Sequence, residues 1–263
     1  MNTSTLLRLL IPVTLVFAAC TKEKSMESGT RPSQGQLVRI QQGADPDLSN
    51  DTVYLISYNP SGQIVSLTDS INHDTLVASY DGSGNITTIA EHASYGPGTT
   101  AFLTYDDNSV LTQVSYNLAG SRENYYFEYT NGVVSKKSYY SDLGSGGSPI
   151  LQGAYKYTVN AGNITDIQEY SQGGQLLNEW TATYGGQDNP WKMLCLFNNG
   201  NLLGMDPFLN YEAFFNKNTL ATFTIAGKAA THIYTYNSLR LPTKLIVDDQ
   251  LHDDIFTWTF GYN

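Results

Sequence analysis

The sequence predicts an all-β protein, an antiparallel meander of about seven to eight repeated β-hairpins in a curled or rolled sheet, with one short helical insertion near 207–218. Two observations predict this fold. A hairpin phrase recurs about every 25 residues, and a period of this length that persists over many copies indicates a repeat architecture. Within the copies, aromatic residues alternate with Ser, Thr and charged residues, which is typical of strands that pack one face and expose the other.

Three segments follow one another along the chain. Segment 1–19 is predicted to be a signal peptide, because Arg8 precedes an apolar run that is too short to span a bilayer as a helix. Segment 20–50 is predicted to be a flexible tether, since it is rich in Ser, Gly, Gln, Pro and charge and has few aromatic residues. Segment 51–263 holds the hairpin repeats, and its length suits one large all-β domain.

In the clearest copy of the hairpin phrase, a strand ends at Tyr80, a turn follows over 81–85, and Ile86 and Ile89 lie in the second strand. Gly and Asn in the turns supply the positive φ angles that tight hairpin loops need. A regular strand would point residues three positions apart to opposite faces. The spacing therefore predicts a β-bulge, or one residue that plugs the turn while the other joins the core. The copies are Tyr58 with Ile64 and Leu67, Tyr80 with Ile86 and Ile89, Tyr105 with Leu111 and Val114, Tyr129 with Val134 and Lys137, Tyr157 with Ile164 and Ile167, Tyr184 with Pro190 and Met193, and Tyr236 with Pro242 and Leu245.

The repeat is interrupted over 189–223. Residues 211–215 are predicted to form a turn or two of helix there. Phe208, Leu209, Phe214 and Phe215 are predicted to cap an open end of the sheet, because bare sheet edges invite aggregation. A ligand site in this insertion is the alternative interpretation.

The end of the apolar run, Val16 to Cys20, places small residues directly before a Cys and resembles the lipobox of bacterial lipoproteins. The resemblance implies that Cys20 is acylated and becomes the first residue of the mature chain, so that acyl chains anchor it without a transmembrane helix. Thr21, rather than Asp, follows Cys20, which by resemblance to lipoprotein sorting in Gram-negative bacteria implies the outer membrane. The domain would then face the periplasm or the cell surface. An ordinary secretory signal with an incidental Cys is the alternative.

The segment Tyr80 to Ile89 matches every position of the pattern Tyr-Asp-x-x-Gly-x-Ile-x-x-Ile. This pattern resembles the YD repeat of RHS-type proteins, and the chain is more closely similar to Bacteroidetes-type lipoproteins with degenerate YD-like repeats and no assigned function. The Asp is kept only after Tyr80 and Tyr105. Long RHS arrays form a hollow shell around a toxin, and the copies here are too few for that role.

The sequence predicts no enzyme and no cofactor. It carries no nucleophile elbow, zinc-protease motif, P-loop or dinucleotide fingerprint. The net charge of −10 disfavours nucleic acid as a partner. Cys195 lies in an apolar run and is interpreted as a small core residue, because a reactive Cys needs an electropositive setting.

Two groups of residues are candidates for binding. Tyr126, Tyr139 and Tyr140 are candidate ligand-binding residues. Two adjacent aromatic residues in a strand must point to opposite faces of the sheet. Tyr126 and one of the other two should therefore face water, where their rings could stack on a sugar. No metal site is predicted. Asp248, Asp249, Asp253 and Asp254 form an oxygen-rich cluster that could attract a cation, with a solvated acidic loop as the alternative.

These patterns predict a non-enzymatic lipoprotein of the outer membrane or cell surface, with a binding or structural role. Its partners would be the membrane, through the N-terminal lipid anchor, and a glycan or a surface protein. A glycan-binding module of a surface nutrient-uptake system is the second hypothesis, and a hydrolase is the third.

Overall fold

The computed structural model describes residues 35–44, 52–94, 98–118, 121–142, 148–197, 211–250 and 254–263. The elements are β1 (Leu37–Ala44), β2 (Thr52–Tyr58), β3 (Ile64–Asp69), β4 (Thr75–Tyr80), β5 (Ile86–His92), β6 (Thr100–Tyr105), β7 (Leu111–Leu118), β8 (Ser121–Thr130), β9 (Val133–Ser141), β10 (Ile150–Asn160), β11 (Asn163–Ser171), β12 (Leu176–Asp188), α1 (Lys192–Phe197), α2 (Tyr211–Phe215), β13 (Asn218–Ile225), β14 (Lys228–Tyr236), β15 (Pro242–Asp249) and β16 (Asp254–Tyr262). None of the helices in this described part is long and apolar enough to cross a membrane.

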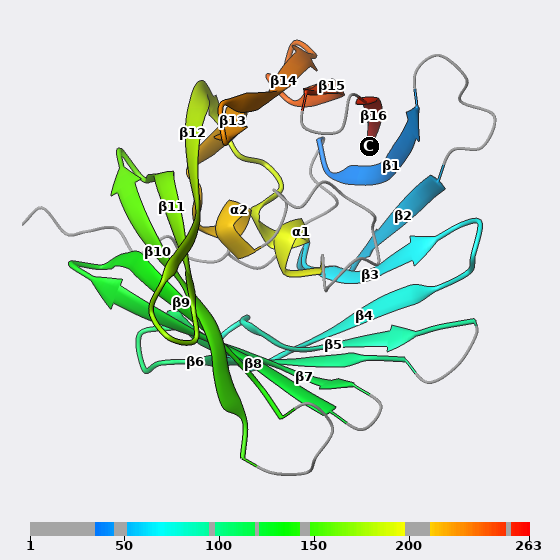
Figure 1. The fold of residues 1–263 in the computed structure, drawn as a ribbon. Helices are drawn as coiled ribbons and strands as arrows, with labels where there is room; N and C mark the ends of the chain where they lie inside the picture. Colours follow the sequence, from blue (N-terminus) through cyan, green and yellow to red (C-terminus); the bar gives the residue numbers. More distant parts are fainter. Residues whose placement is uncertain are drawn as a thin grey trace, which may run out of the picture.

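The strands form a closed barrel in which each strand pairs antiparallel with the next and β16 returns to pair with β1 (Figure 1). The all-β antiparallel meander is confirmed, but the predicted curled or rolled sheet of seven to eight hairpins is wrong, because the sheet closes with sixteen strands. The closing strand β1 lies within segment 20–50, which sequence analysis predicted to be a tether. In β1, the buried Ile40 pairs with Tyr54 of β2 on one side and with Phe260 of β16 on the other.

The insertion differs from the single helix predicted near 207–218. Helix α2 lies in that range, but α1 replaces the second strand of the hairpin predicted after Tyr184. Pro190 favours the first turn of a helix, and the Asn189 side chain accepts a hydrogen bond from the backbone N–H of Trp191 at 3.0 Å. Strand β12 therefore pairs with β13, which follows the two helices in sequence.

In the hairpins that keep both strands, a bulge near the repeat Tyr turns both residues of the apolar pair into the barrel. In the first copy, Tyr58 pairs with Ile64 and Ile56 pairs with Leu67, with a register shift between Ser57 and Tyr58. Both Ile64 and Leu67 are buried. Equivalent shifts occur in β4–β5, β6–β7, β8–β9 and β14–β15. In β10–β11 the shift lies between Thr158 and Val159, after the repeat Tyr, so the predicted β-bulge is confirmed in all these hairpins.

The repeat Tyr residues use their hydroxyl groups to connect neighbouring copies. Tyr58 donates to the carbonyl of Leu37 at 2.7 Å, Tyr80 to Ile64 at 2.6 Å, Tyr129 to Leu111 at 2.6 Å, and Tyr184 to Ile164 at 2.6 Å. Tyr262, which ends β16, donates in the same way to the carbonyl of Pro242 at 2.8 Å. Burial raises the pKa of Tyr58, Tyr80 and Tyr262 to about 12. These Tyr side chains are therefore neutral core residues with satisfied hydroxyl groups.

The residue after the repeat Tyr organises the turn. The Asp81 carboxylate accepts hydrogen bonds from the backbone N–H groups of Ser83 and Asn85. Asn59 and Asn237 accept the same pair of bonds through their amide oxygen in their own copies. Asp and Asn thus do the same work here, which explains why the Asp of the pattern is not always kept.

The outer wall of the barrel is mainly polar. Outward positions that face each other across strands include Ser57 with Ser66, Ser79 with Thr88, Thr104 with Gln113, Glu128 with Lys136, Thr158 with Asp166, Thr183 with Thr222, and Lys244 with Thr259. Exposed apolar residues such as Leu55, Phe102 and Ile233 lie among them. A lipid-facing barrel carries an outward apolar band about 25 Å tall and a polar interior. This barrel has the opposite arrangement, which suits a wall in contact with water.

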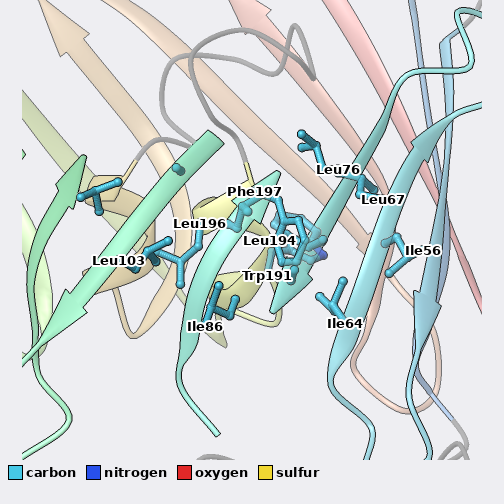
Figure 2. Packing of buried hydrophobic residues seen from close by; sticks show 14 of the residues in the cluster. Ile56, Ile64, Leu67, Leu76, Ile86, Leu103, Trp191, Leu194, Leu196 and Phe197 are labelled. Atoms are coloured by element: carbon cyan, nitrogen blue, oxygen red, sulfur yellow. The ribbon is translucent and has the colours of Figure 1, made fainter. Parts of the chain in front are cut away.

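Helix α1 packs inside the barrel against the early strands. Leu194, Leu196 and Phe197 of α1 and the preceding Trp191 are buried among aliphatic side chains from β2 to β6 (Figure 2). Barrels of about sixteen strands are too wide for wall side chains alone to fill them. The helix supplies the missing core in this half of the lumen.

Candidate functional site

A cavity of about 830 Å³ occupies the other half of the lumen. Strands β9 to β16 line most of it, together with α2 and the neighbouring residues of the insertion. The lining extends from Glu212 and Ala213 in α2 to Ala226 in the β13–β14 turn. This turn lies at the end of the barrel opposite the repeat Tyr residues. The cavity exists because α1 fills only the half of the lumen beside the early strands.

The cavity walls are mainly aromatic and aliphatic. The rings of Tyr155 and Trp180 stack with their centroids 6.2 Å apart. All three Trp residues of the chain line the cavity, at positions 180, 191 and 258. The indole N–H of Trp258 is buried and has no hydrogen-bond partner among the described residues, so a donor is available beside the cavity. The aliphatic wall residues are Ile164, Ile167, Ala182, Leu220, Ile225, Leu245 and Val247.

A buried ion pair lies where α2 meets the wall. Lys137 Nζ of β9 is 2.5 Å from Glu212 Oε1, and the Tyr157 hydroxyl donates to the same oxygen at 2.7 Å. Lys137 Nζ also lies 4.3 Å from the centroid of the Tyr155 ring, close enough for a cation–π interaction. Burial alone would raise the pKa of the Glu212 carboxyl, but the Lys137 charge and the two hydrogen bonds outweigh burial and hold that pKa below its ordinary value.

Glu169 is a second carboxylate that faces the lumen, near the end of the barrel that holds the β13–β14 turn. Glu169 of β11 pairs with Tyr155 in register, and it accepts hydrogen bonds from the Tyr155 hydroxyl at 3.1 Å and from the Asn178 amide at 2.6 Å. Unlike Glu212, it forms no ion pair with a cation of the described residues. The carboxylates that line the cavity are Glu169, Glu212 and Asp249, and the ammonium groups are Lys137 and Lys228.

The predicted tyrosines divide between the two faces of the wall. Tyr126 is 41% exposed on the outside, and its ring meets that of Tyr140 edge-on, with 5.4 Å between centroids. Tyr139 points inward, stacks on Tyr125 at 5.0 Å and donates to Glu123. The structure thus brings Tyr126 and Tyr140 together and separates Tyr139 from them.

The two acidic candidates whose side chains the structure describes lie on opposite faces of the wall. Asp248 is exposed on the outer wall, whereas the next residue, Asp249, is buried and lines the cavity. Asp253 and the side chain of Asp254 lie outside the described residues. Within the described part of the chain, no group of three or more His, Cys, Asp or Glu residues could hold a metal ion.

The two Cys residues have separate outcomes. Cys20 lies outside the described residues, so its lipidation stays a prediction. Cys195 is buried in α1, where its thiol donates to the carbonyl of Trp191 at 3.3 Å. Burial raises the pKa of this thiol to about 12, which keeps it protonated and unreactive near neutral pH.

No protein-family model and no curated protein matches the chain. Among solved structures, it is similar to a porin-like protein from Bacteroides uniformis ATCC 8492, with a TM-score of 0.55 and 12% identity over 89% of this chain and 99% of that one. A porin-like protein from Bacteroides vulgatus ATCC 8482 gives a TM-score of 0.54 and 9% identity, over 87% and 99%. At these identities the likeness shows the fold alone.

Proposed function

We propose that the chain is a non-enzymatic, lipid-anchored protein of the outer membrane or cell surface that binds a small ligand inside its barrel. The observation that carries this proposal is the cavity of about 830 Å³, whose aromatic and aliphatic walls hold a few polar groups. Cavities of about 300–1,000 Å³ with this composition are typical of small-molecule sites.

The polar outer wall supports an anchored barrel in water rather than a barrel embedded in lipid. Acyl chains on Cys20 would hold the domain at the membrane, and the segment between Cys20 and β1 would connect the two. Helices α1 and α2 lie in the lumen (Figure 1), which favours a pocket over an open pore.

Filling the cavity tests the binding proposal. Ala182 lines the cavity between Trp180 and Tyr184, so Ala182→Phe should occupy the space that a ligand needs. The neutral dye N-phenyl-1-naphthylamine is expected to accept energy from the Trp residues when it binds in the lumen. The Ala182→Phe variant should weaken this binding at least about tenfold, a loss of about 1.4 kcal/mol.

Thr181→Phe is the matched control, because Thr181 is the outward-facing neighbour on the same strand. It should bind the dye as the unmodified protein does. Absence of energy transfer in the unmodified protein, or equal binding by both variants, would contradict a ligand site in the lumen.

The anchor is tested separately. Cys20→Ala should abolish palmitate labelling and release the protein from the membrane fraction, because it removes the thiol that would be acylated. Unchanged labelling and fractionation would show that Cys20 is not the anchor, without affecting the proposed lumen site.

A second candidate function is glycan binding on the outer wall. The exposed Tyr126 ring and its contact with Tyr140 favour it, since such rings can stack on sugars and use their hydroxyl groups. A sugar that raises the melting temperature of Ala182→Phe but not that of Tyr126→Ala would assign binding to this face.

A further inference from the structure

We infer that the lumen binds an amphipathic amine, with its protonated head between Glu169 and the Trp180 ring and its apolar body along the inner wall. This inference rests on the proposed function, because it names the class of ligand for the same cavity.

The inner wall favours an apolar body. Side chains such as Ile167, Phe223, Val247 and Phe256 line the middle of the cavity and offer no hydrogen bonds. A sugar would place hydroxyl groups against them, and each hydroxyl left without a hydrogen-bond partner would weaken its binding. A hydrocarbon chain or ring system of similar size would bury its surface there at no such cost.

Glu169 provides the acceptor for the head. The two hydrogen bonds that it accepts come from the neutral side chains of Tyr155 and Asn178, so no cation of the described residues neutralises its charge. A carboxylate can accept about four hydrogen bonds, which leaves capacity for an ammonium group. Glu212 is a poorer acceptor for the head, because Lys137 already pairs with it.

The aromatic rings beside Glu169 also favour a cation. Glu169 pairs with Tyr155 of β10 on one side and with Asn178 of β12 on the other. Trp180 lies two residues after Asn178 in β12, so its side chain points to the same inner face. Lys137 Nζ lies over the Tyr155 ring, which shows that this cluster already accepts one ammonium group. A ligand ammonium over Trp180 would gain the same kind of attraction, which is strongest for Trp.

The balance of charge around the cavity points in the same direction. Its lining carries the three carboxylates and two ammonium groups named above, so a cationic head is favoured over an anionic one. The net charge of −10 on the whole chain acts in the same sense.

The experiment compares two probes that differ only in the head, dodecylammonium and dodecanoate, titrated below their micelle concentrations at neutral pH. Trp fluorescence is the readout, since every Trp of the chain lines the cavity. Dodecylammonium should bind at least about tenfold more tightly than dodecanoate. Glu169→Gln should remove most of this preference by weakening dodecylammonium alone, and Trp180→Leu should weaken dodecylammonium more than dodecanoate.

Glu179→Gln is the matched control. Glu179 of β12 points outward and accepts a hydrogen bond from Gln168 of β11 at 2.8 Å. On the inner face of the same strand pair, Glu169 of β11 accepts a hydrogen bond from Asn178 of β12. This variant should keep both affinities. Because Glu169 is only partly buried, Glu169→Gln should fold normally, and its melting curve checks this.

Three results would overturn the inference: equal binding of the two probes, tighter binding of dodecanoate, or an unchanged preference in Glu169→Gln. If both probes bind equally and Ala182→Phe abolishes both, the lumen site stands and only the head-group assignment fails. If neither probe binds the unmodified protein, the proposed function fails with the inference.

Discussion

Lys137→Met is expected to lower the free energy of unfolding by about 3–5 kcal/mol. The substitution would leave Glu212 as a buried carboxylate that keeps only its hydrogen bond from Tyr157 among its side-chain partners. Urea denaturation followed by Trp fluorescence would measure the loss, because Trp180 and Trp191 line the same cavity as Glu212.

The neighbouring residue provides the control. Lys136 forms an exposed ion pair with Glu128 at 2.6 Å on the outer face of the same strand, and exposed pairs contribute only about 0–1 kcal/mol. Lys136→Met should therefore change stability little. The double variant Lys137→Met/Glu212→Leu should recover much of the loss, because it removes both buried charges. Equal stability of Lys137→Met and Lys136→Met would contradict a structural role for the buried pair.

The ion pair of Lys137 and Glu212 makes the stability of the fold depend on pH, and Lys137→Met should reverse the direction of this dependence. In the unmodified protein the folded pKa of Glu212 is depressed, so its contribution to stability is present above the unfolded value of about 4.3 and is lost as the pH falls. In Lys137→Met, burial acts without the compensating cation and raises that pKa. Below neutral pH the variant should then gain stability from this group as the pH falls.

Ile40→Asp is expected to cost at least about 4 kcal/mol and to leave the chain largely unfolded. Ile40 is 1% exposed on the strand that closes the barrel, so an Asp there would bury a carboxylate without a partner. Circular dichroism and Trp fluorescence would report the loss of the fold.

Gln41→Asp is the control for this position. Gln41 faces outward and accepts a hydrogen bond from Arg39 at 2.6 Å, which an Asp carboxylate could also accept. This variant should keep nearly the full stability. If Ile40→Asp were as stable as Gln41→Asp, residues 37–44 would behave as the tether that sequence analysis predicted, and the barrel would not depend on β1.

Local features of the fold could be predicted because they depend on neighbours in sequence. The alternation of Tyr54, Ile56 and Tyr58 predicts a strand with one packed face, and the spacing of Ile64 and Leu67 predicts a bulge. Closure could not be predicted in this way. Strand β1 carries Gln41, Gln42 and Gly43, whose composition is typical of a tether, and it pairs with β16, which is far from it in sequence.

The candidate site was harder to predict, because its residues come from many strands and the insertion. One signal was present in the sequence: Lys137 occupies a position that is apolar in most copies, so a buried charge needs a partner. Glu212 is that partner, 75 residues further along the chain. Nothing local to Glu169 or Trp180 distinguishes their inward positions from those of ordinary core residues.

The hydrogen bonds that connect successive copies through their Tyr hydroxyl groups have a consequence for the evolution of this architecture. In these hairpins the Tyr hydroxyl donates to a backbone carbonyl of the preceding strand pair, as Tyr80 does to the carbonyl of Ile64. A hairpin could therefore be duplicated or lost with its hydrogen bonds intact. The barrel would then gain or lose one pair of strands, and its diameter would change accordingly. Three repeat Tyr residues depart from this pattern: Tyr157 donates to Glu212, Tyr236 bonds with Thr219, and Tyr105 makes no such bond among the described residues. Related chains with more or fewer hairpins could in this way enclose ligands of different sizes.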